Sequence, residues 1–366
     1  MAQDAVSAFP QPSFWRGKRV LVTGHTGFKG GWLSLWLDRL GAEVAGYALP
    51  PDTDPSLFAL CRIGEIAEHH VGDVRDPDAL QRVMAAFRPD IVFHLAAQPL
   101  VRASYADPVG TYATNVMGTV NLLEAVRRTP SVTVAVVVTS DKCYAEDTGR
   151  LPYGEGDPMG GRDPYSSSKG AAELVTAAYA HSFLAARGCA VATVRAGNVL
   201  GGGDWAVDRL AADIMRGLLA GQEPVLRNPG AVRPWQHVLD PLRGYLLAAE
   251  HLARTRPTAP ATWNFGPDAA SEVTVREVAG MLCDLWGDGA KIQVAPQPDA
   301  PHEAHMLRLS SDKARRELGW TPALPLADAL TETVAWFRAC QRGDDMRAVS
   351  RGQIERHGGL AMKAAQ

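Results

Sequence analysis

A strand, a glycine-rich turn and a helix follow one another near the start of the chain, and this succession constrains the fold more than any other feature. The apolar run RVLVT leads into G-x-x-G-x-x-G, with Gly24, Gly27 and Gly30, and an apolar helical pattern follows at once. Glycine permits a tight turn and a close backbone approach, and the free N–H groups of a helix start attract phosphate. In this context the motif predicts a dinucleotide pyrophosphate loop in the first unit of a parallel sheet.

The same alternation continues through the first half of the chain. Strand-like runs occupy residues 19–24, 43–49, 69–74, 90–97, 134–141 and 189–199. Helical patterns lie between them near residues 30–40, 77–87, 110–128 and 165–187. Alternation of this kind indicates parallel strands with crossover helices, and runs such as VAVVV are apolar throughout because helices cover both faces. We therefore predict an α/β fold with a Rossmann-type doubly wound parallel sheet.

The composition and pattern of the sequence change after Asn198. Glycine and proline become frequent, as in GGGD, RNPGAVRPW and PTAPATWNFGP, and the strand-like runs become short. We expect residues 1–198 to form mainly the dinucleotide-binding domain and residues 199–345 mainly a smaller C-terminal α/β substrate lobe. Residues 346–366 lack clear periodicity and are expected to form a loose tail or an arm.

Composition excludes several classes of protein. The chain has 366 residues, 46% hydrophobic and 21% charged, with a formal net charge of −3 and no block of like charges, so nucleic acid is not expected as a partner. Five scattered cysteines without a C-x-x-C pair predict neither a disulfide framework nor a metal site. No apolar run has the length of a signal peptide or of the roughly 20 residues that span a bilayer. We expect a cytoplasmic protein without a membrane partner.

Residues at the carboxyl ends of the strands are expected to border the cofactor. These candidates are Gly24, His25, Thr26, Gly27, Phe28, Lys29, Gly30, Asp73, Val74, Leu95, Ala96, Ala97, Gln98 and Thr139. The second strand ends in GYALPP without an acidic residue for the adenosine ribose, and Asp52 comes late, so this position leaves NAD and NADP both open. Lys29 falls on the first helical turn, where its charge either reaches a phosphate or lies in solvent.

A candidate acid–base site combines TSDKCY, at the end of the fifth strand, with PYSSSKGAAEL. Tyr165 and Lys169 are four residues apart and share one face if the segment is helical. A tyrosine has a pKa near 10, so it acts as a base near pH 7 only after about three units of depression. A lysine cation about 4 Å away supplies about that much at an effective dielectric near 20. On the residues alone, an ordinary helix that carries a chance Y-x-x-x-K pair stays an alternative.

These motifs resemble a known family. TGHTGFKG, HLAAQ, TSDK and YSSSK, in this order, are similar to the motifs of the extended short-chain dehydrogenase/reductases up to about residue 270. Within that family, GHTGFKGGWLSLWL, SDKCY, DPMGGRDPYSSSKGAAEL, RNPGAVRPWQHVLDPLRGYLL and PHEAHMLRLSSDKA resemble the CDP-glucose 4,6-dehydratases from about residue 17 to 340. The resemblance implies NAD as cofactor and CDP-glucose as substrate. It also implies a homo-oligomer, with a dimer favoured, that pairs the helices near residues 110–128 and 165–187 of each subunit.

The resemblance also implies a mechanism, in which carbon 4 is oxidised, water is lost across carbons 5 and 6, and hydride returns to carbon 6. Tyr165 with Lys169 then serves the oxidation, Ser140 binds the carbon 4 oxygen and Asp141 protonates the departing hydroxyl. Lys142 stands where related dehydratases have a glutamate that acts as the carbon 5 base. Lysine can replace it only if its pKa falls well below about 10.4, so a base role and an electrostatic role both stay open.

Substrate contacts are expected by the same resemblance at Gln98, Asn198, Arg209, Arg233, His302 and Arg308. Arginine suits a diphosphate because its planar fork binds two oxygens, although each arginine has a structural salt bridge as its alternative role. Another nucleotide-hexose dehydratase or a 4-epimerase on the same scaffold is the alternative enzyme. A cofactor-sensing regulatory protein is the alternative outside enzymes, and such proteins typically lack the tyrosine or the lysine of the pair.

Overall fold

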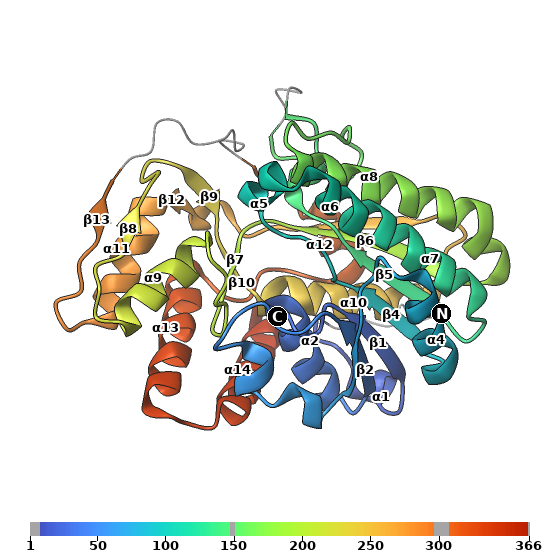
Figure 1. Cartoon of the computed structure of the whole chain (residues 1–366), viewed down its shortest axis with the longest axis horizontal. Coiled ribbons are helices and arrows are strands. Elements are labelled where there is room, and N and C mark those ends of the chain that lie inside the picture. The colour runs from blue at the N-terminus through green and yellow to red at the C-terminus, as the bar shows by residue number, and fades with distance from the viewer. Residues whose placement is uncertain (1–7, 147–150, 296–306, 365–366) are drawn as a thin grey trace.

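A seven-stranded parallel sheet forms the centre of the computed structural model, which describes residues 8–146, 151–295 and 307–364 (Figure 1). The strand order is β11-β6-β5-β4-β1-β2-β3, so the order reverses between β1 and β4. In doubly wound sheets such a reversal marks the crevice that binds ligands. The strands are β1 (Arg19–Thr23), β2 (Glu43–Ala48), β3 (Glu68–Val71), β4 (Ile91–His94), β5 (Val134–Val138), β6 (Ala190–Ala196) and β11 (Ala261–Phe265). The first six confirm the predicted strands and their parallel arrangement.

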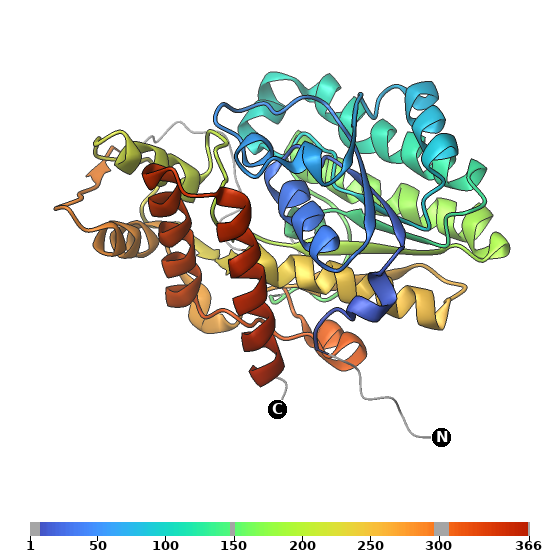
Figure 2. The same cartoon turned by 90° about the horizontal axis from the view of Figure 1, so that it is seen from below.

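Helices cover both faces of this sheet (Figures 1 and 2). In β1, Val20 and Val22 join the apolar cluster beneath α2 and α10, whereas Leu21 joins the cluster beneath α4 and α7. Apolar side chains of the helices cover both faces of the sheet, which explains why the strands are apolar at successive positions. These helices are α2 (Phe28–Arg39), α4 (Pro77–Phe87), α7 (Gly118–Arg128), α8 (Pro164–Tyr179) and α10 (Leu239–Thr255).

Helix α8 begins one residue before Tyr165, and local sequence fixes that start. Asp163 is the N-cap, and its side chain accepts a hydrogen bond from the Ser166 N–H at 2.9 Å. Pro164 occupies the first helical position, where its missing N–H leaves nothing unsatisfied. The helix then continues through a π-helical turn η5 (Ala180–Leu184) and a short η6 (Ala185–Arg187), which together match the predicted helical segment.

The remaining helices and turns of the first half connect the strands of the sheet. The helix predicted near residues 110–128 is divided into α6, a π-helical turn η2 and α7. The connecting elements are α1 (Pro12–Trp15), α3 (Leu57–Leu60), η1 (Ile63–Glu65), α5 (Val101–Ala106), α6 (Pro108–Tyr112), η2 (Ala113–Met117) and η3 (Asp141–Cys143).

A smaller lobe follows β6, but two later elements of the chain return to the central sheet. Strand β11 pairs along β6 in the central sheet, and α10 packs against β5 and β6. The edge of β6 would otherwise carry unpaired backbone groups, and β11 satisfies them. The lobe itself holds three two-stranded pairs: β7 with β10, β9 with β12 and β8 with β13. Its elements are β7 (Val199–Leu200), α9 (Leu210–Leu219), β8 (Val225–Leu226), β9 (Val232–Pro234), β10 (Gln236–His237), η7 (Ala269–Ser271), β12 (Glu272–Thr274), α11 (Val275–Trp286), β13 (Gln293–Val294) and α13 (Leu326–Arg342). Helix α12 (Asp312–Leu318) instead packs against α10 and β11.

The last segment is the helix α14 (Met346–Ala364), not the loose tail or arm expected from the sequence. It packs against α13 and α2, and Figure 2 shows it beside α13 as the second of two red helices. The buried face of α14 contains the polar residues Ser350, Gln353 and His357, so a pattern of apolar residues does not reveal the helical period. Each of these polar side chains has a partner: the indole of Trp336 donates to Ser350 at 2.9 Å, and His357 lies 2.9 Å from Asp240.

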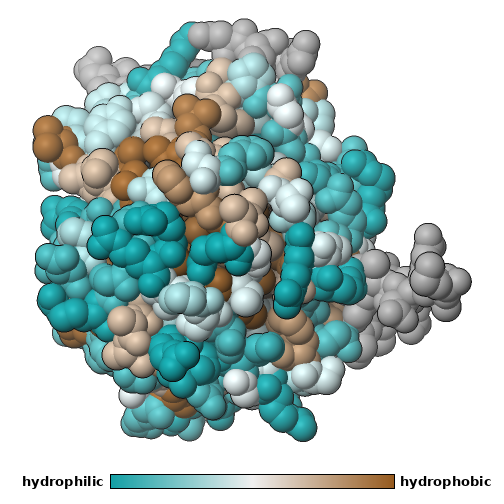
Figure 3. Space-filling view, turned by 90° about the vertical axis from the view of Figure 1, so that its right-hand side faces the viewer, coloured by the Kyte–Doolittle hydropathy of each residue, from teal (hydrophilic) through white to brown (hydrophobic). Residues whose placement is uncertain are grey.

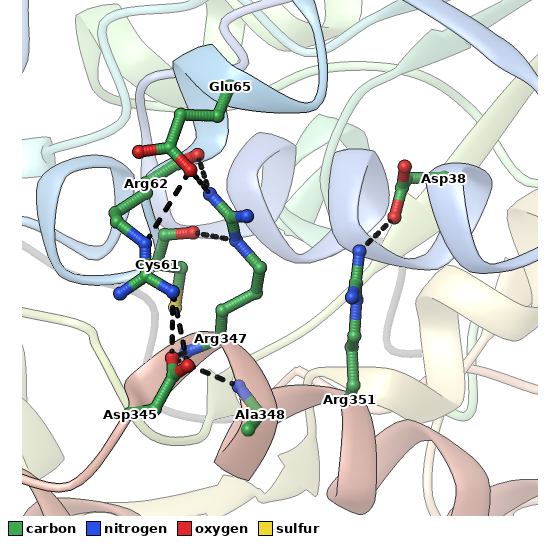
Figure 4. A network of polar contacts seen from close by, with 8 residues as sticks. All are labelled: Asp38, Cys61, Arg62, Glu65, Asp345, Arg347, Ala348 and Arg351. Atoms are coloured by element: carbon green, nitrogen blue, oxygen red, sulfur yellow. Dashed lines mark hydrogen bonds and ion pairs between the residues drawn. The ribbon is translucent and has the colours of Figure 1, made fainter.

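Charged groups fasten α14 to the cofactor side of the molecule (Figure 4). Arg347 donates to the Cys61 carbonyl at 2.8 Å and pairs with Glu65 at 2.7 Å. Arg351 pairs with Asp38 of α2 at 2.5 Å. Because α14 also packs on α13 of the smaller lobe, it connects the two parts of the molecule. Within the residues that the structure describes, no helix is both long and apolar enough to cross a bilayer.

Candidate active site

A cleft of about 510 Å³ follows the carboxyl edge of the sheet, from the glycine-rich turn to the smaller lobe. It brings together most of the residues that the sequence singled out. The predicted residues that line it are Gly24, Thr26, Gly27, Phe28, Lys29, Gly30, Asp73, Val74, Leu95, Ala96, Ala97, Thr139, Ser140, Asp141, Lys142, Tyr165, Lys169, Asn198 and Arg209.

The glycine-rich turn is built for an anion. A Cβ on Gly30 would lie 2.1 Å from the Gly24 carbonyl oxygen, and one on Gly24 would lie 2.7 Å from the Ala96 nitrogen, so neither position admits a side chain. Gly27 is the N-cap of α2 and supplies no side-chain cap. The N–H groups of the first turn are therefore left for a ligand, as a dinucleotide pyrophosphate requires. These residues fit the pyrophosphate of NAD.

The far end of the cleft favours the unphosphorylated ribose of NAD. Asp52 and Asp73 line it together with Arg75. The Arg75 guanidinium donates to the Asp73 carboxylate at 2.8 Å and holds the pKa of Asp73 below its ordinary value. Arg75 is thereby neutralised, whereas a 2′-phosphate would need a free cation at this end. Carboxylates suit ribose hydroxyls, so this end of the cleft fits the unphosphorylated ribose of NAD.

His25 and Gln98, both predicted beside the cofactor, do not line the cleft. The His25 ring lies where a Cβ on Gly46 would be, and its Nε2 is 2.7 Å from His69 Nδ1. Burial, with His69 adding to it, lowers the pKa of His25 to about 3, so the ring is neutral. The Gln98 side chain donates to Thr111 at 3.0 Å and accepts from the Leu100 N–H at 2.6 Å. Contact of either side chain with a cofactor stays a prediction.

Tyr165 and Lys169 lie in the cleft on successive turns of α8, as their spacing predicted. Burial raises the pKa of Tyr165 to about 12, against a side-chain hydrogen bond with Ser140. Lys169 Nζ donates to the Val138 carbonyl at 3.3 Å, and burial lowers the pKa of Lys169 to about 8 while Glu173 opposes that shift. Among the protein's own groups, burial and the nearby Asp141 and Asp163 thus raise the tyrosine pKa, which is the reverse of the depression expected from the sequence.

The second acid–base group is the short turn that follows β5. Ser140 Oγ donates to Asp141 Oδ1 at 2.9 Å and accepts from the Lys142 N–H at 3.2 Å, which closes the turn η3. Burial raises the pKa of Asp141, while Lys142, Lys29 and other cations oppose the rise. The acid form of Asp141 is therefore easier to populate than that of an exposed aspartate. Lys142 is half-buried and lines the same cleft.

Lys29 does not lie in solvent, which was one of its two expected positions. It is partly buried in the cleft, where burial and then Arg209 lower the pKa of Lys29 to about 8. Asp141, Lys169 and Asp204 also act on its charge. The lysine of the glycine-rich turn thus belongs to the electrostatics of the catalytic end.

The substrate end contains two of the predicted contacts and one acid that the sequence did not indicate. Asn198 and Arg209 line the cleft, and Arg209 pairs with Asp204 at 3.1 Å. Asp204 follows the GGG run, and nothing in its local pattern distinguishes it from a turn residue. Trp205 and Trp235 also line this end.

Two other predicted substrate contacts, Arg233 and Arg308, are not among the described residues that line the cleft. Arg233, on β9, is buried and acts on the charge of Asp141. The Arg308 side chain forms an ion pair with Glu272, and the Arg308 backbone carbonyl accepts a hydrogen bond from the Tyr153 N–H at 2.8 Å. His302 lies outside the described residues. Substrate contacts at these positions stay predictions.

A doubly wound sheet with a pyrophosphate turn and a Tyr-x-x-x-Lys pair in one cleft defines an extended short-chain dehydrogenase/reductase. The chain belongs to the GDP-mannose 4,6 dehydratase family, whose family model matches residues 21–333.

Known relatives agree with this placement. The CDP-glucose 4,6-dehydratase of Salmonella typhimurium is 49% identical over 347 residues, which cover 93% of this chain and 96% of the relative. A dTDP-glucose 4,6-dehydratase of Streptomyces griseus is 32% identical over 87% of this chain and 93% of its own length. Among solved structures, the Thermus thermophilus UDP-glucose 4-epimerase complex with NAD matches with a TM-score of 0.72 and 28% identity, over 87% of this chain and 99% of that one.

Proposed function

We propose that this chain is a cytoplasmic hydro-lyase that converts CDP-glucose to CDP-4-keto-6-deoxyglucose, a step of deoxysugar biosynthesis, with NAD as a recycled cofactor. The observation that carries the proposal is the presence of two acid–base groups in one cleft: Tyr165 with Lys169, and Asp141 with Lys142. An ordinary dehydrogenase needs the first group alone. The 49% identity to a CDP-glucose 4,6-dehydratase supports the choice of substrate.

The cofactor site is formed by the glycine-rich turn and the strand ends. When bound, NAD accepts hydride from carbon 4 of the sugar, returns it to carbon 6, and adds positive charge near the tyrosine. The first turn of α2 holds the pyrophosphate, and Asp52 and Asp73 face the adenosine ribose.

The oxidation step requires a base at the carbon 4 hydroxyl. Tyr165 takes this proton, and Lys169 stabilises the resulting phenolate, because a cation favours the charged form of a neighbouring acid. Ser140, which hydrogen-bonds the tyrosine, holds the carbon 4 oxygen in line. General-base help of this kind typically contributes about 10²–10⁴-fold to the rate.

The elimination step uses the turn after β5. The new ketone at carbon 4 acidifies the carbon 5 proton, which Lys142 removes in its neutral form. Asp141 gives its proton to the carbon 6 hydroxyl, which leaves as water. The raised pKa of Asp141 favours its acid form, as the departing hydroxyl requires. The carbon 5 proton is returned when hydride reaches carbon 6.

Substrate binding falls to the smaller lobe. Arg209 presents a planar guanidinium at the cleft, where it pairs with Asp204 at 3.1 Å, and such a fork suits a diphosphate. Asn198 lines the same end, and Gln98, Arg233, Arg308 and His302 remain proposed contacts by family resemblance. Recognition of cytosine rests on that resemblance as well.

A panel of nucleotide sugars tests the proposal. Incubation with CDP-, dTDP-, GDP- and UDP-glucose, followed by mass analysis, is expected to show loss of one water from CDP-glucose and no net reduction of NAD. A product of unchanged mass would instead favour a 4-epimerase, and dehydration of another nucleotide sugar would favour a different dehydratase. A regulatory protein would turn over none of them.

A homodimer through the helices near residues 110–128 and 165–187, which are α6, η2, α7, α8 and η5, is part of the proposal. Apolar side chains gather in the upper left of Figure 3, the side on which α7 and α8 lie. Exposed apolar side chains on α6, η2, α8 and η5 are Val109 (78%), Tyr112 (41%), Met117 (52%), Leu174 (63%) and Phe183 (48%). Patches of this kind mark protein interfaces. Leu174→Asp is expected to halve the molar mass in light scattering, and a wild-type monomer would contradict the dimer.

A further inference from the structure

A buried ion pair lies close to both acid–base groups in the chain and in space. Glu173, one turn after Lys169 on α8, pairs with Arg195 of β6 at 2.7 Å, and their side chains are 5% and 3% exposed. Neither residue is among those that line the cleft. A buried pair is costly unless further hydrogen bonds complete it.

The Glu173 carboxylate has partners on both oxygens. One oxygen accepts from Arg195 Nε at 2.8 Å and from the Thr139 hydroxyl. The other accepts from Arg195 Nη2 and from the Thr193 hydroxyl, at 2.7 and 2.6 Å. Four donors therefore meet one carboxylate, which fixes its position.

Two of these contacts lead to the ends of the catalytic turn. Thr139, which Glu173 holds, immediately precedes Ser140. Arg195 Nη1 donates to the Tyr144 hydroxyl at 2.6 Å, and Tyr144 immediately follows η3. The Tyr144 hydroxyl in turn donates to Asn264 of β11 at 2.8 Å. The ion pair thus holds the chain on both sides of the turn, whose internal hydrogen bonds reach only from Ser140 to Cys143.

We propose that Glu173, together with Arg195, is a positioning residue for the reaction: it holds the Ser140–Cys143 turn through Thr139 and Tyr144. This inference rests on the proposed dehydration. It explains how a single short helical turn, closed by the Cys143 N–H to Ser140 carbonyl bond at 3.3 Å, can hold two catalytic side chains. A misplacement of about 1 Å can cost about 10²-fold in rate.

The chain offers a matched pair of variants. Thr139 and Thr193 donate to the same carboxylate, and Val has nearly the shape of Thr, so each change leaves Glu173 short of one bond. Only Thr139 leads to the turn. Thr139→Val is expected to lower kcat on CDP-glucose by about 10-fold to 100-fold, with KM nearly unchanged. The loss of kcat in Thr193→Val is expected to be smaller by a factor of at least about ten. Thr139→Ser keeps the hydroxyl and is expected to restore kcat.

A second measurement separates positioning from mere support of the fold. The charged or titratable groups that face Lys169 are Tyr165 and Glu173 on its own helix, Cys143 on η3, His94 on β4 and Lys29 on α2. Glu173 is the group that raises the pKa of Lys169 most. In Glu173→Gln, the fall of kcat/KM at alkaline pH is therefore expected to move to lower pH.

The outcomes distinguish this inference from the function beneath it. If the wild-type chain does not dehydrate CDP-glucose, the proposed function fails. If it does, and the two valine variants lose kcat equally, the positioning role is wrong. If kcat/KM of a folded Glu173→Gln protein falls at the same alkaline pH as in the wild type, the link between Glu173 and Lys169 is wrong. Circular dichroism melts and NAD binding by calorimetry confirm that each variant is folded, and the threonine pair suffices if Glu173→Gln does not fold.

Discussion

The two acid–base groups of the cleft are held in place in different ways. Tyr165 and Lys169 sit on α8, whose N-cap, first-turn proline and backbone hydrogen bonds fix their spacing within a few residues of sequence. Asp141 and Lys142 sit on a turn of three residues. The turn depends on side chains from α8, β6 and β11, which are distant in sequence. The first group is thus a local structure, and the second is a tertiary one.

The largest effect is expected from Tyr165→Phe, which removes one hydroxyl from the local group. The ring stays in its buried site, but no base remains at carbon 4, so turnover of CDP-glucose should fall about 10²–10⁴-fold. Both the oxidation and the later exchange at carbon 5 should stop, because the second group acts only on the ketone. A folded Tyr165→Phe protein with wild-type turnover would falsify the assignment of the first group.

Lys142→Ala tests the tertiary group by separating the two half-reactions. If Lys142 is the carbon 5 base, oxidation continues, and a bound 4-keto-glucose that retains its 6-hydroxyl accumulates. Deuterium exchange at carbon 5 should fall by about 10²-fold or more. Single-turnover absorbance of the reduced cofactor and mass analysis of the bound sugar provide the measurement.

Lys142→Arg is the matched control for that experiment. Arginine keeps the positive charge but does not lose its proton in proteins, so it cannot serve as the base. Activity restored by arginine would assign Lys142 an electrostatic role at the enolate. A normal carbon 5 exchange rate in Lys142→Ala would rule out the base role and direct attention to Asp141.

The pH dependence should report the local group. Burial lowers the pKa of Lys169 to about 8, and the oxidation needs the charged form. As pH rises through about 8 the charge is lost, so kcat/KM should fall by about tenfold for each further pH unit. Lys29 also has a pKa lowered to about 8. Lys169→Arg distinguishes the two, since the fall should disappear if Lys169 causes it and persist if Lys29 does.

The same contrast explains what could be predicted from the sequence. The sheet, its six first strands and the Tyr165–Lys169 pair follow from period and spacing, which are local properties. β11 and the Glu173–Arg195 pair join segments that are far apart in sequence, and no local pattern connects them. Arg195 occurs within an apolar strand, where it gives no sign that its partner lies on α8. The helix α14 was missed because Ser350, Gln353 and His357 fill its buried stripe.

The smallest effect is expected from Asp163→Ala, which removes the cap of α8. The cap accepts hydrogen bonds from the Ser166 N–H at 2.9 Å and from its hydroxyl at 2.5 Å, and its loss should lower the free energy of unfolding by about 0.5–2 kcal/mol. The remaining turns of α8 still place Tyr165 and Lys169 on one face, so kcat should fall by less than about tenfold, whereas Thr139→Val should cost more. Urea unfolding and steady-state rates provide both numbers, and Asp163→Asn, which retains a capping oxygen, is the control. If Asp163→Ala reduced kcat as much as Tyr165→Phe while the protein stayed folded, the first group would need its surroundings as much as the second does, and the distinction between a local and a tertiary catalytic group would be lost.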